Sequence, residues 1–248
     1  MSSTPSTEDH HLIRFKTVLG KDALIATDFS SKELMSQGFR FEIIAFSETQ
    51  HSLQPKDLVG TKATIGLVKD DGTIRYFNGF IKDLVGLGST RAGQRTEYKL
   101  TLTSWLELLL DKRSDCRVFQ EKTVKDLLPE IFAPYGGAAN YKLDLTLPHP
   151  ERRFVIQYNE TDLEFFNRIC LREGIAYYFK HEDGSHQLHL IDKSDSLSVL
   201  SPKTVKLQIG TFAYDHFSYW ERAGNFVTGT YKQRSYNYMT PSKELTGT

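Results

Sequence analysis

Cysteine is scarce in this chain, which has two in 248 residues, Cys116 and Cys170. Two cysteines so far apart form neither a disulfide scaffold nor a C-x-x-C motif. We expect both thiols to be reduced, with Cys170 in the core.

An excess of charge of one sign is also absent, because Lys plus Arg and Asp plus Glu number 31 each. No net field attracts nucleic acid or anionic lipid, and no basic stretch is interleaved with aromatic residues. The longest apolar run, Trp105 to Leu110, contains Glu107 and is far shorter than the roughly 20 residues of a membrane span. The sequence therefore predicts no nucleic-acid partner and no membrane anchor.

The amino terminus lacks the basic and apolar character of a secretory signal peptide, since it is polar and acidic. We expect residues 1–10 to be a disordered lead-in. The length of the chain allows one large domain or two of about 120 residues, each long enough to bury a core.

Aromatic residues are plentiful, with 12 Tyr and 16 Phe, and most alternate with polar residues as in half-buried strands. The same alternation occurs in residues 13–16, 39–43, 62–67 and 98–103. Asp70-Asp71-Gly72 predicts a hairpin turn, and Gly86 to Gly93 a longer, mobile loop. The first 110 residues thus predict a closed or nearly closed antiparallel barrel.

After the first 110 residues, apolar residues recur at helical spacing. Thr123 is the predicted N-cap of a helix reaching Ala133, which Pro129 should kink or shorten. Pro134 to Gly137 ends that helix, and Leu147 to Pro150 is an extended connector. Strand-like alternation returns in residues 206–214 and 225–238, so the second half is predicted to be α+β.

The stretch from Arg152 to His181 combines a strand, a helix and a hairpin. Phe154 to Tyr158 is a strand, and Thr161-x-x-Glu164 is a capping box for the helix that follows. Gly174 supplies the left-handed residue that ends this helix. The predicted apolar face of the helix consists of Leu163, Phe165, Phe166, Ile169 and Cys170. Strands from Ile175 to His181 and from His186 to Ile191 form the hairpin.

Three histidines lie near this hairpin, and histidine is a common metal ligand. Alternation places His181 and His186 opposite each other, whereas His189 points to the other face. We therefore expect no metal and no cofactor.

The carboxylates of Glu160, Asp162 and Glu164 could provide an acid and base pair, but capping accounts for two of them. Ser104 lacks a G-x-S-x-G elbow, and Gly86 to Thr90 is neither a P-loop nor a dinucleotide motif. Aromatic residues at strand spacing near the carboxyl end could stack a sugar, but core and interface roles are commoner. They are Phe217, Tyr219, Trp220, Phe226, Tyr231, Tyr236 and Tyr238. The sequence therefore predicts no catalytic site.

The segment "FVIQYNETDLEFFNRICLREGIAYYFKHEDG" resembles the signature of the VgrG family, the spike-hub proteins of type VI secretion systems. "LTSWLELLLDKRSDCRVFQEKTVKDLLPEIF" and "LVGTKATIGL" are similar to further stretches of that family, so the resemblance covers roughly residues 11–247. The resemblance assigns structural roles to a set of signature residues. They are Trp105, Arg117, Phe119, Gln120, Phe154, Gln157, Tyr158, Glu160, Thr161, Asp162, Phe165, Glu173, Gly174 and Tyr178.

The resemblance implies a mainly β, α+β fold with two antiparallel barrels like those of a phage tail hub, and inserted helices. The first barrel would occupy residues 11–115. Residues 116–248 would hold the helical connector, the strand–helix–hairpin unit and a second barrel region, incomplete because the chain is a fragment or a truncated homologue. Three chains would form a pseudo-six-fold ring.

The implied partners are a hexameric tube protein, downstream spike domains, a tip protein and effectors. The implied location is the cytoplasm during assembly, followed by delivery out of the cell without a signal peptide. A phage baseplate hub, and a peptidoglycan-cleaving effector enzyme, are the alternatives.

Overall fold

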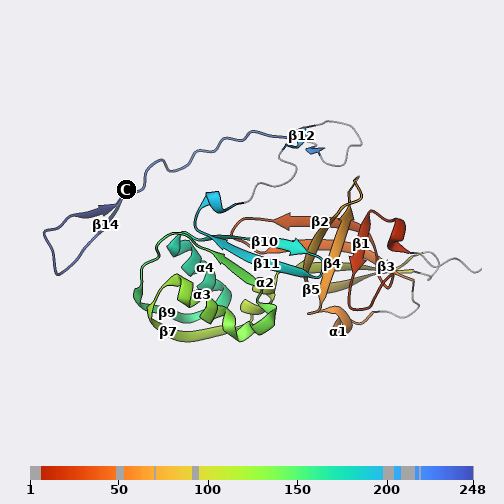
Figure 1. Cartoon of the computed structure of the whole chain (residues 1–248), viewed down its shortest axis with the longest axis horizontal. Helices are drawn as coiled ribbons and strands as arrows, with labels where there is room; N and C mark the ends of the chain where they lie inside the picture. The colour runs from red at the N-terminus through yellow and green to blue at the C-terminus, as the bar shows by residue number, and fades with distance from the viewer. Residues whose placement is uncertain are drawn as a thin grey trace, which may run out of the picture. The chain divides into compact units, whose positions relative to one another are not determined.

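The computed structural model describes residues 7–48, 53–69, 71–90, 95–197, 204–207, 216–217 and 219–247 (Figure 1). Contacts divide the chain into two units, Met1–Val199 and Leu200–Thr248. The mainly β fold with inserted helices is confirmed. No helix in these ranges is both long and apolar enough to cross a lipid bilayer.

The first part of Met1–Val199 is a curled antiparallel sheet of six strands in the order β1-β4-β5-β6-β3-β2. The two edge strands, β1 and β2, lie close together without a backbone ladder between them in the described residues, so the predicted, nearly closed barrel is present. The strands are β1 (Ile13–Lys16), β2 (Ile25–Glu33), β3 (Phe39–Ser47), β4 (Lys62–Val68), β5 (Ile74–Thr90) and β6 (Arg95–Thr103).

The alternating apolar residues of these strands fill the barrel. Phe41, Ile43 and Ile65 are completely buried, as are Leu100 and Leu102 on the neighbouring strand β6. A short helix, α1 (Pro55–Leu58), contributes buried Leu58 to the same core. The period-two pattern of the sequence therefore corresponds to the inner face of the barrel.

Of the two connections predicted within the barrel, the hairpin turn at Gly72 is present and the loop from Gly86 is not. Gly72 adopts a φ of 79°, and the backbone N–H of Thr73 donates to Asp71 at 2.8 Å, which confirms the hairpin. The predicted mobile loop from Gly86 is wrong, because β5 continues to Thr90 and pairs with β6. Its register shifts between Gly86 and Gly88, so these glycines form a bulge within a strand. Residues 91–93 of that prediction lie outside the described ranges.

The predicted lead-in contains ordered residues at its end. Glu8–His10 form a 3-10 turn, η1, and the buried Glu8 carboxylate accepts from the backbone N–H of Phe15 at 2.7 Å. Residues 7–10 therefore belong to the folded unit.

The second part of Met1–Val199 has a second core, made by three helices, a two-stranded ribbon and a three-stranded sheet. The ribbon pairs β7 (Ser114–Lys122) with β9 (Arg152–Thr161) in antiparallel fashion. In the sheet, ordered β10-β11-β8, β11 pairs antiparallel to β10 and parallel to β8. The remaining elements are α2 (Trp105–Leu110), α3 (Val124–Phe132), η2 (Ala133–Ala138), β8 (Tyr141–Asp144), α4 (Asp162–Glu173), β10 (Ala176–Glu182), β11 (Ser185–Ile191) and η3 (Ser194–Ser196).

Helix α3 begins at the predicted cap, where Thr123 and Asp126 form a capping box. Pro129 lies inside this helix and does not shorten it, since the helix continues to Phe132. Proline removes one helical hydrogen bond, but buried Leu128, Ile131 and Phe132 anchor the segment in the core. Tertiary packing therefore outweighs the unfavourable effect of proline inside a helix.

The unit Leu200–Thr248 has little regular structure in its described residues. Strands β12 (Lys206–Leu207) and β13 (His216–Phe217) form one short ladder, and β14 (Gln233–Ser235) and β15 (Leu245–Gly247) form another. The predicted strand over residues 225–238 is therefore wrong except for residues 233–235, and most of residues 206–214 lie outside the described ranges. The second barrel stays a prediction.

Candidate functional site

Helix α4 is held at both ends by the local signals that the sequence predicted. The Thr161 hydroxyl accepts from the backbone N–H of Glu164 at 3.1 Å, and the Glu164 carboxylate accepts from the N–H of Thr161 at 2.7 Å. Gly174 ends the helix with a φ of 69°. The capping box and the left-handed terminator are confirmed, and Phe165, Phe166, Ile169 and Cys170 are buried.

Thr161→Ala is expected to lower the free energy of unfolding by about 1 kcal/mol, because the N–H of Glu164 loses its acceptor. Urea denaturation measures the change. Thr161→Ser retains the hydroxyl and serves as the control, with a midpoint close to that of the parent chain. An alanine variant with an unchanged midpoint would show that the cap contributes nothing.

The first residue of α4, Asp162, is the centre of a buried polar network. Its carboxylate accepts from the Arg117 guanidinium at 2.5 Å, from the Gln157 amide at 2.8 Å and from the Tyr135 hydroxyl at 2.6 Å. Arg117 also donates to the Gln157 side-chain oxygen at 2.8 Å. The network thus joins β7, β9, η2 and α4, and three signature residues converge in it.

Burial defines the electrostatics of this network, since Asp162 is completely buried and Arg117 is largely so. Burial, together with the hydrogen bond to Asp162, raises the pKa of the Tyr135 hydroxyl. Tyr135 therefore remains a hydrogen-bond donor to the carboxylate at any physiological pH. The network thus acts by holding β7, β9, η2 and α4 together.

Three carboxylates, from which a hydrolytic acid and base pair could have been drawn, each have a separate partner. Glu160 pairs with Arg168, Asp162 with Arg117, and Glu164 with the N–H of Thr161. Each carboxylate is engaged in fixing α4 to the ribbon or in capping it. The capping interpretation is therefore confirmed for Glu164, whereas Asp162 binds the side chains of the buried network and Glu160 pairs with Arg168.

The histidines of the hairpin lie as alternation predicted. His181 and His186 are direct cross-strand partners with ring centroids 6.0 Å apart, whereas His189 stacks on Tyr178 at 5.3 Å. The Nδ1 atom of His189 lies 3.0 Å from the Asp144 carboxylate. No group of three or more His, Cys, Asp or Glu residues positioned for a metal ion occurs within the described ranges.

His186 connects the barrel to α2 through hydrogen bonds. Its Nε2 accepts from the backbone N–H of Trp105 at 3.1 Å, and its Nδ1 lies 2.8 Å from the Asn78 side-chain oxygen. Asn78 of β5 is itself buried and donates to Thr64 and to the carbonyl of Ala63. Neutral His186 satisfies both contacts, as acceptor at Nε2 and donor at Nδ1.

The environment of His186 opposes its protonation. Burial, and secondarily the positive charge of His181 and Lys62, lowers the pKa of His186 from 6.5 to about 3. Phe39, Phe80 and Phe179 surround the ring. The sequence did not predict this link, because Asn78 and Trp105 lie 108 and 81 residues from His186.

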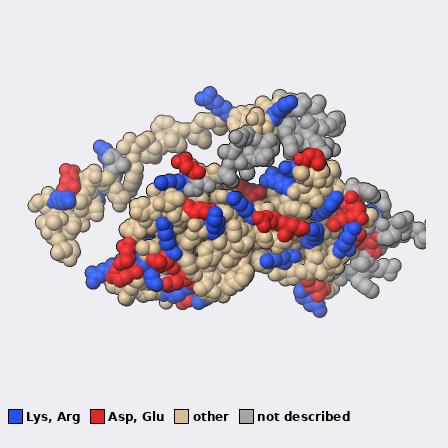
Figure 2. Space-filling model, in the orientation of Figure 1, with Lys and Arg blue, Asp and Glu red and all other residues tan. Residues whose placement is uncertain are grey.

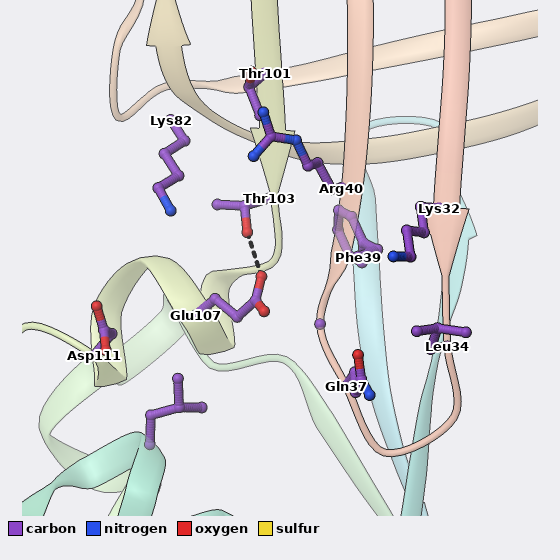
Figure 3. Close-up of a pocket in the computed structure, with 12 residues that line it drawn as sticks. Lys32, Leu34, Gln37, Phe39, Arg40, Lys82, Thr101, Thr103, Glu107 and Asp111 are labelled. Carbon is purple, nitrogen blue, oxygen red and sulfur yellow. Dashed lines mark hydrogen bonds between the residues drawn. The ribbon is translucent and has the colours of Figure 1, made fainter.

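A groove of about 400 Å³ lies between the barrel and α2, with side chains of both charges around it (Figure 3). The Glu107 carboxylate accepts from the Thr103 hydroxyl at 2.6 Å, and it packs against Gly38, where a Cβ atom would lie 2.0 Å from its Cδ. Lys32, Arg40 and Lys82 provide the cations of the groove. No local motif could have predicted it, because its walls come from separate strands, a loop and the two helices α2 and α4.

Some of the signature residues are buried, some are partly buried and some are exposed. Trp105, Phe119, Gln157, Asp162 and Phe165 are buried, and Phe119 stacks on Phe165 with centroids 5.6 Å apart. Two others are exposed large side chains on one face of the β7–β9 ribbon, Phe154 and Tyr158. Intrachain packing therefore accounts for the first group but not for these two.

Comparison with protein families matches residues 32–248 to the phage tail baseplate hub (GPD) family. The type VI secretion system spike protein VgrG1b of Pseudomonas aeruginosa is 30% identical, over 94% of this chain and 31% of its own length. Spike protein VgrG1a of the same organism is 28% identical, over 94% of this chain and 36% of its own length. The chain thus spans about a third of the length of these curated relatives.

Similar solved structures agree on the fold. The Escherichia coli c3393 protein, described as a type VI secretion component resembling bacteriophage T4 tail proteins gp27 and gp5, has a TM-score of 0.67 at 19% identity. That match covers 91% of this chain and 56% of the other. A VgrG complex with PdpA from Francisella has a TM-score of 0.51 at 10% identity, over 74% of this chain and 31% of the other.

Proposed function

Because the chain belongs to the phage tail baseplate hub (GPD) family, with VgrG spike proteins among its relatives, we propose that it is a structural hub of a type VI secretion spike. The observation that carries this proposal is the match to VgrG1b over 94% of the chain. The chemistry of the described residues agrees with it, because the central polar network and the paired histidines hold structural elements together.

The proposed assembly is a homotrimer. With two similar barrels per chain, three chains would present six similar surfaces to a hexameric tube protein and keep three-fold symmetry toward downstream spike domains, a tip protein and effectors. The nearly closed barrel of β1 to β6 supplies the first of these barrels. The second barrel region is proposed within residues 116–248.

The proposed location follows from the same role. The hub would assemble in the cytoplasm and leave the cell through the secretion machine. The region described here would contribute rigidity and interface area, and no bond-breaking step is assigned to it.

The proposed assembly predicts a concentration-dependent mixture of monomer and trimer. Balanced charge gives neither strong repulsion nor steering between copies, so the apolar area at the interface decides the affinity, and the share of trimer rises with protein concentration. Sedimentation velocity at several concentrations measures the distribution. A tight dimer or hexamer at all concentrations, without a three-fold species, would contradict the proposal.

A further inference from the structure

The groove between the barrel and α2 continues along the outer face of the barrel sheet. A second hollow of about 470 Å³ adjoins it and shares three lining residues with it, Arg40, Lys82 and Thr101. The second hollow follows β5 and β6 as far as Val85 and Lys99. Each hollow has the size of an ordinary ligand site. Because they share a wall, we treat them as one continuous site and call it the double groove.

Two cations of the double groove face each other across neighbouring strands. Lys32 of β2 is the direct partner of Arg40 of β3, and Arg40 is in turn the direct partner of Thr103 of β6. Like charges directly opposite each other in a sheet are destabilising. Glu42 relieves Arg40, since its carboxylate lies 2.8 Å from the guanidinium, but Lys32 has no ion-pair partner among the described residues. An anion between Lys32 and Arg40 would remove the repulsion.

A β-bulge brings a third cation to the same place. The register between β5 and β6 shifts between Ile81 and Asp83, so Lys82 is the extra residue at this point. Bulges re-aim a side chain, and they are common next to active sites. Lys82 also has no ion-pair partner in the part of the chain that the structure describes. Figure 3 shows the nitrogen ends of Lys32 and Lys82 turned inward from opposite sides of the groove.

Acidic side chains on the remaining walls limit the kind of anion. Glu107 and Asp111 line the groove beside α2, and Asp83 lines the second hollow. These carboxylates repel a polyanion such as nucleic acid or an anionic lipid surface, which would place several negative charges against them. A single carboxylate between the lysines avoids this repulsion. The Glu107 carboxylate, which accepts from the Thr103 hydroxyl, can also accept a backbone N–H of the same occupant.

Apolar side chains lie on both sides of the cations. Leu34 and Leu163 line the groove, and Val59, Leu84 and Val85 line the second hollow. Leu34 is 47% exposed and Val85 is 51% exposed, so both can be covered further. An extended peptide with one acidic side chain between apolar ones matches this order of charge and apolar surface.

We infer that the double groove binds an extended peptide segment of a partner protein, in which one aspartate or glutamate lies between apolar side chains. The carboxylate of the segment lies between Lys32, Arg40 and Lys82, and its apolar side chains cover the leucines and valines of the two hollows. The site belongs to the barrel of a single copy. It therefore depends on neither the second barrel nor the proposed trimer.

Two short capped peptides test this site, one with an aspartate between two valines and one with asparagine in place of the aspartate. Nuclear magnetic resonance titration of the isotope-labelled full chain measures both affinities and shows which residues respond. The aspartate peptide is expected to bind about tenfold more tightly or better, and to shift the amide signals of Arg40, Thr101 and Thr103. Equal affinities, or responses confined to other parts of the chain, would overturn the inference.

Lysine variants identify the groups responsible. The double change Lys32→Gln and Lys82→Gln is expected to weaken binding of the aspartate peptide about tenfold or more. Lys125→Gln, at an exposed position on α3, is the matched control and leaves the affinity unchanged. Binding that survives the double change contradicts the site. Tighter binding of a short DNA duplex or of anionic lipid vesicles at the same residues also contradicts it, because the double groove would then be a general polyanion site.

Lys32→Glu separates a binding role from a structural one. It replaces the repulsion between β2 and β3 with an attraction to Arg40, so the denaturation midpoint is expected to rise while peptide binding is lost. A lower midpoint would assign Lys32 to the stability of the barrel, and retained binding would show that its charge is not needed; either result refutes the site. Absence of a trimer in sedimentation contradicts the proposed function and leaves the peptide site standing.

Discussion

Asp162→Ala is expected to lower the free energy of unfolding by about 3–5 kcal/mol, because it leaves the Arg117 guanidinium largely buried without its carboxylate. The Gln157 amide and the Tyr135 hydroxyl lose the same acceptor. Removing one member of a buried network costs more than the net value of any single contact, since each remaining polar group keeps its desolvation cost.

Urea denaturation of purified protein measures this effect. Asp115→Ala is the matched control, because Asp115 pairs with Arg113 and Arg117 at a more exposed position and its loss is expected to shift the midpoint far less. Asp162→Asn keeps the shape of the side chain and should fall between the two. Equal midpoints for Asp162→Ala and Asp115→Ala would show that the buried network does not stabilise the fold.

The features that the sequence predicts well are those set by neighbours along the chain. The capping box of Thr161 and Glu164 and the terminator Gly174 involve residues a few positions apart, and all three act as predicted. The strands of the barrel follow from period-two alternation, because one face of each strand must be buried. Local chemistry thus predicts α4 and the barrel.

The polar networks depend on residues that meet only after folding. Arg117 and Asp162 are 45 residues apart, and Asn78 and His186 are 108 apart. No spacing rule connects such pairs. The signature residues Arg117, Gln157 and Asp162 were therefore assigned by resemblance, and the structure supplies their physical reason.

Two predictions were wrong for opposite reasons, the loop beginning at Gly86 and the strand over residues 225–238. Gly86 and Gly88 lie within β5 because pairing with β6 outweighs the low strand preference of glycine. Residues 225–232 have suitable alternation but do not form a strand, since alternation specifies a strand only where a neighbouring strand is present to pair with it. In both segments the available partner, and not the local sequence, decides the structure.

Acidification from pH 6.5 to pH 5 is expected to lower the free energy of unfolding by roughly 2 kcal/mol through His186 alone. The folded chain holds the pKa of His186 at about 3, against 6.5 for an ordinary histidine. The unfolded chain therefore takes up a proton near pH 6.5 while the folded chain does not. The stability due to neutral His186 is fully present above pH 6.5 and is lost progressively as the pH falls toward 3.

Protonated His186 could no longer accept from the N–H of Trp105, and its charge would face His181 and Lys62 among aromatic rings, so the contact between the barrel and α2 should fail first. Denaturation midpoints at half-unit pH steps measure the slope of the free energy of unfolding against pH. His186→Gln removes the titrating group and should flatten the slope between pH 6.5 and 5, whatever its stability at pH 7. His181→Gln is the matched control and should retain most of the slope. A parent chain and His186→Gln variant with the same pH dependence would refute the assignment of this acid sensitivity to His186.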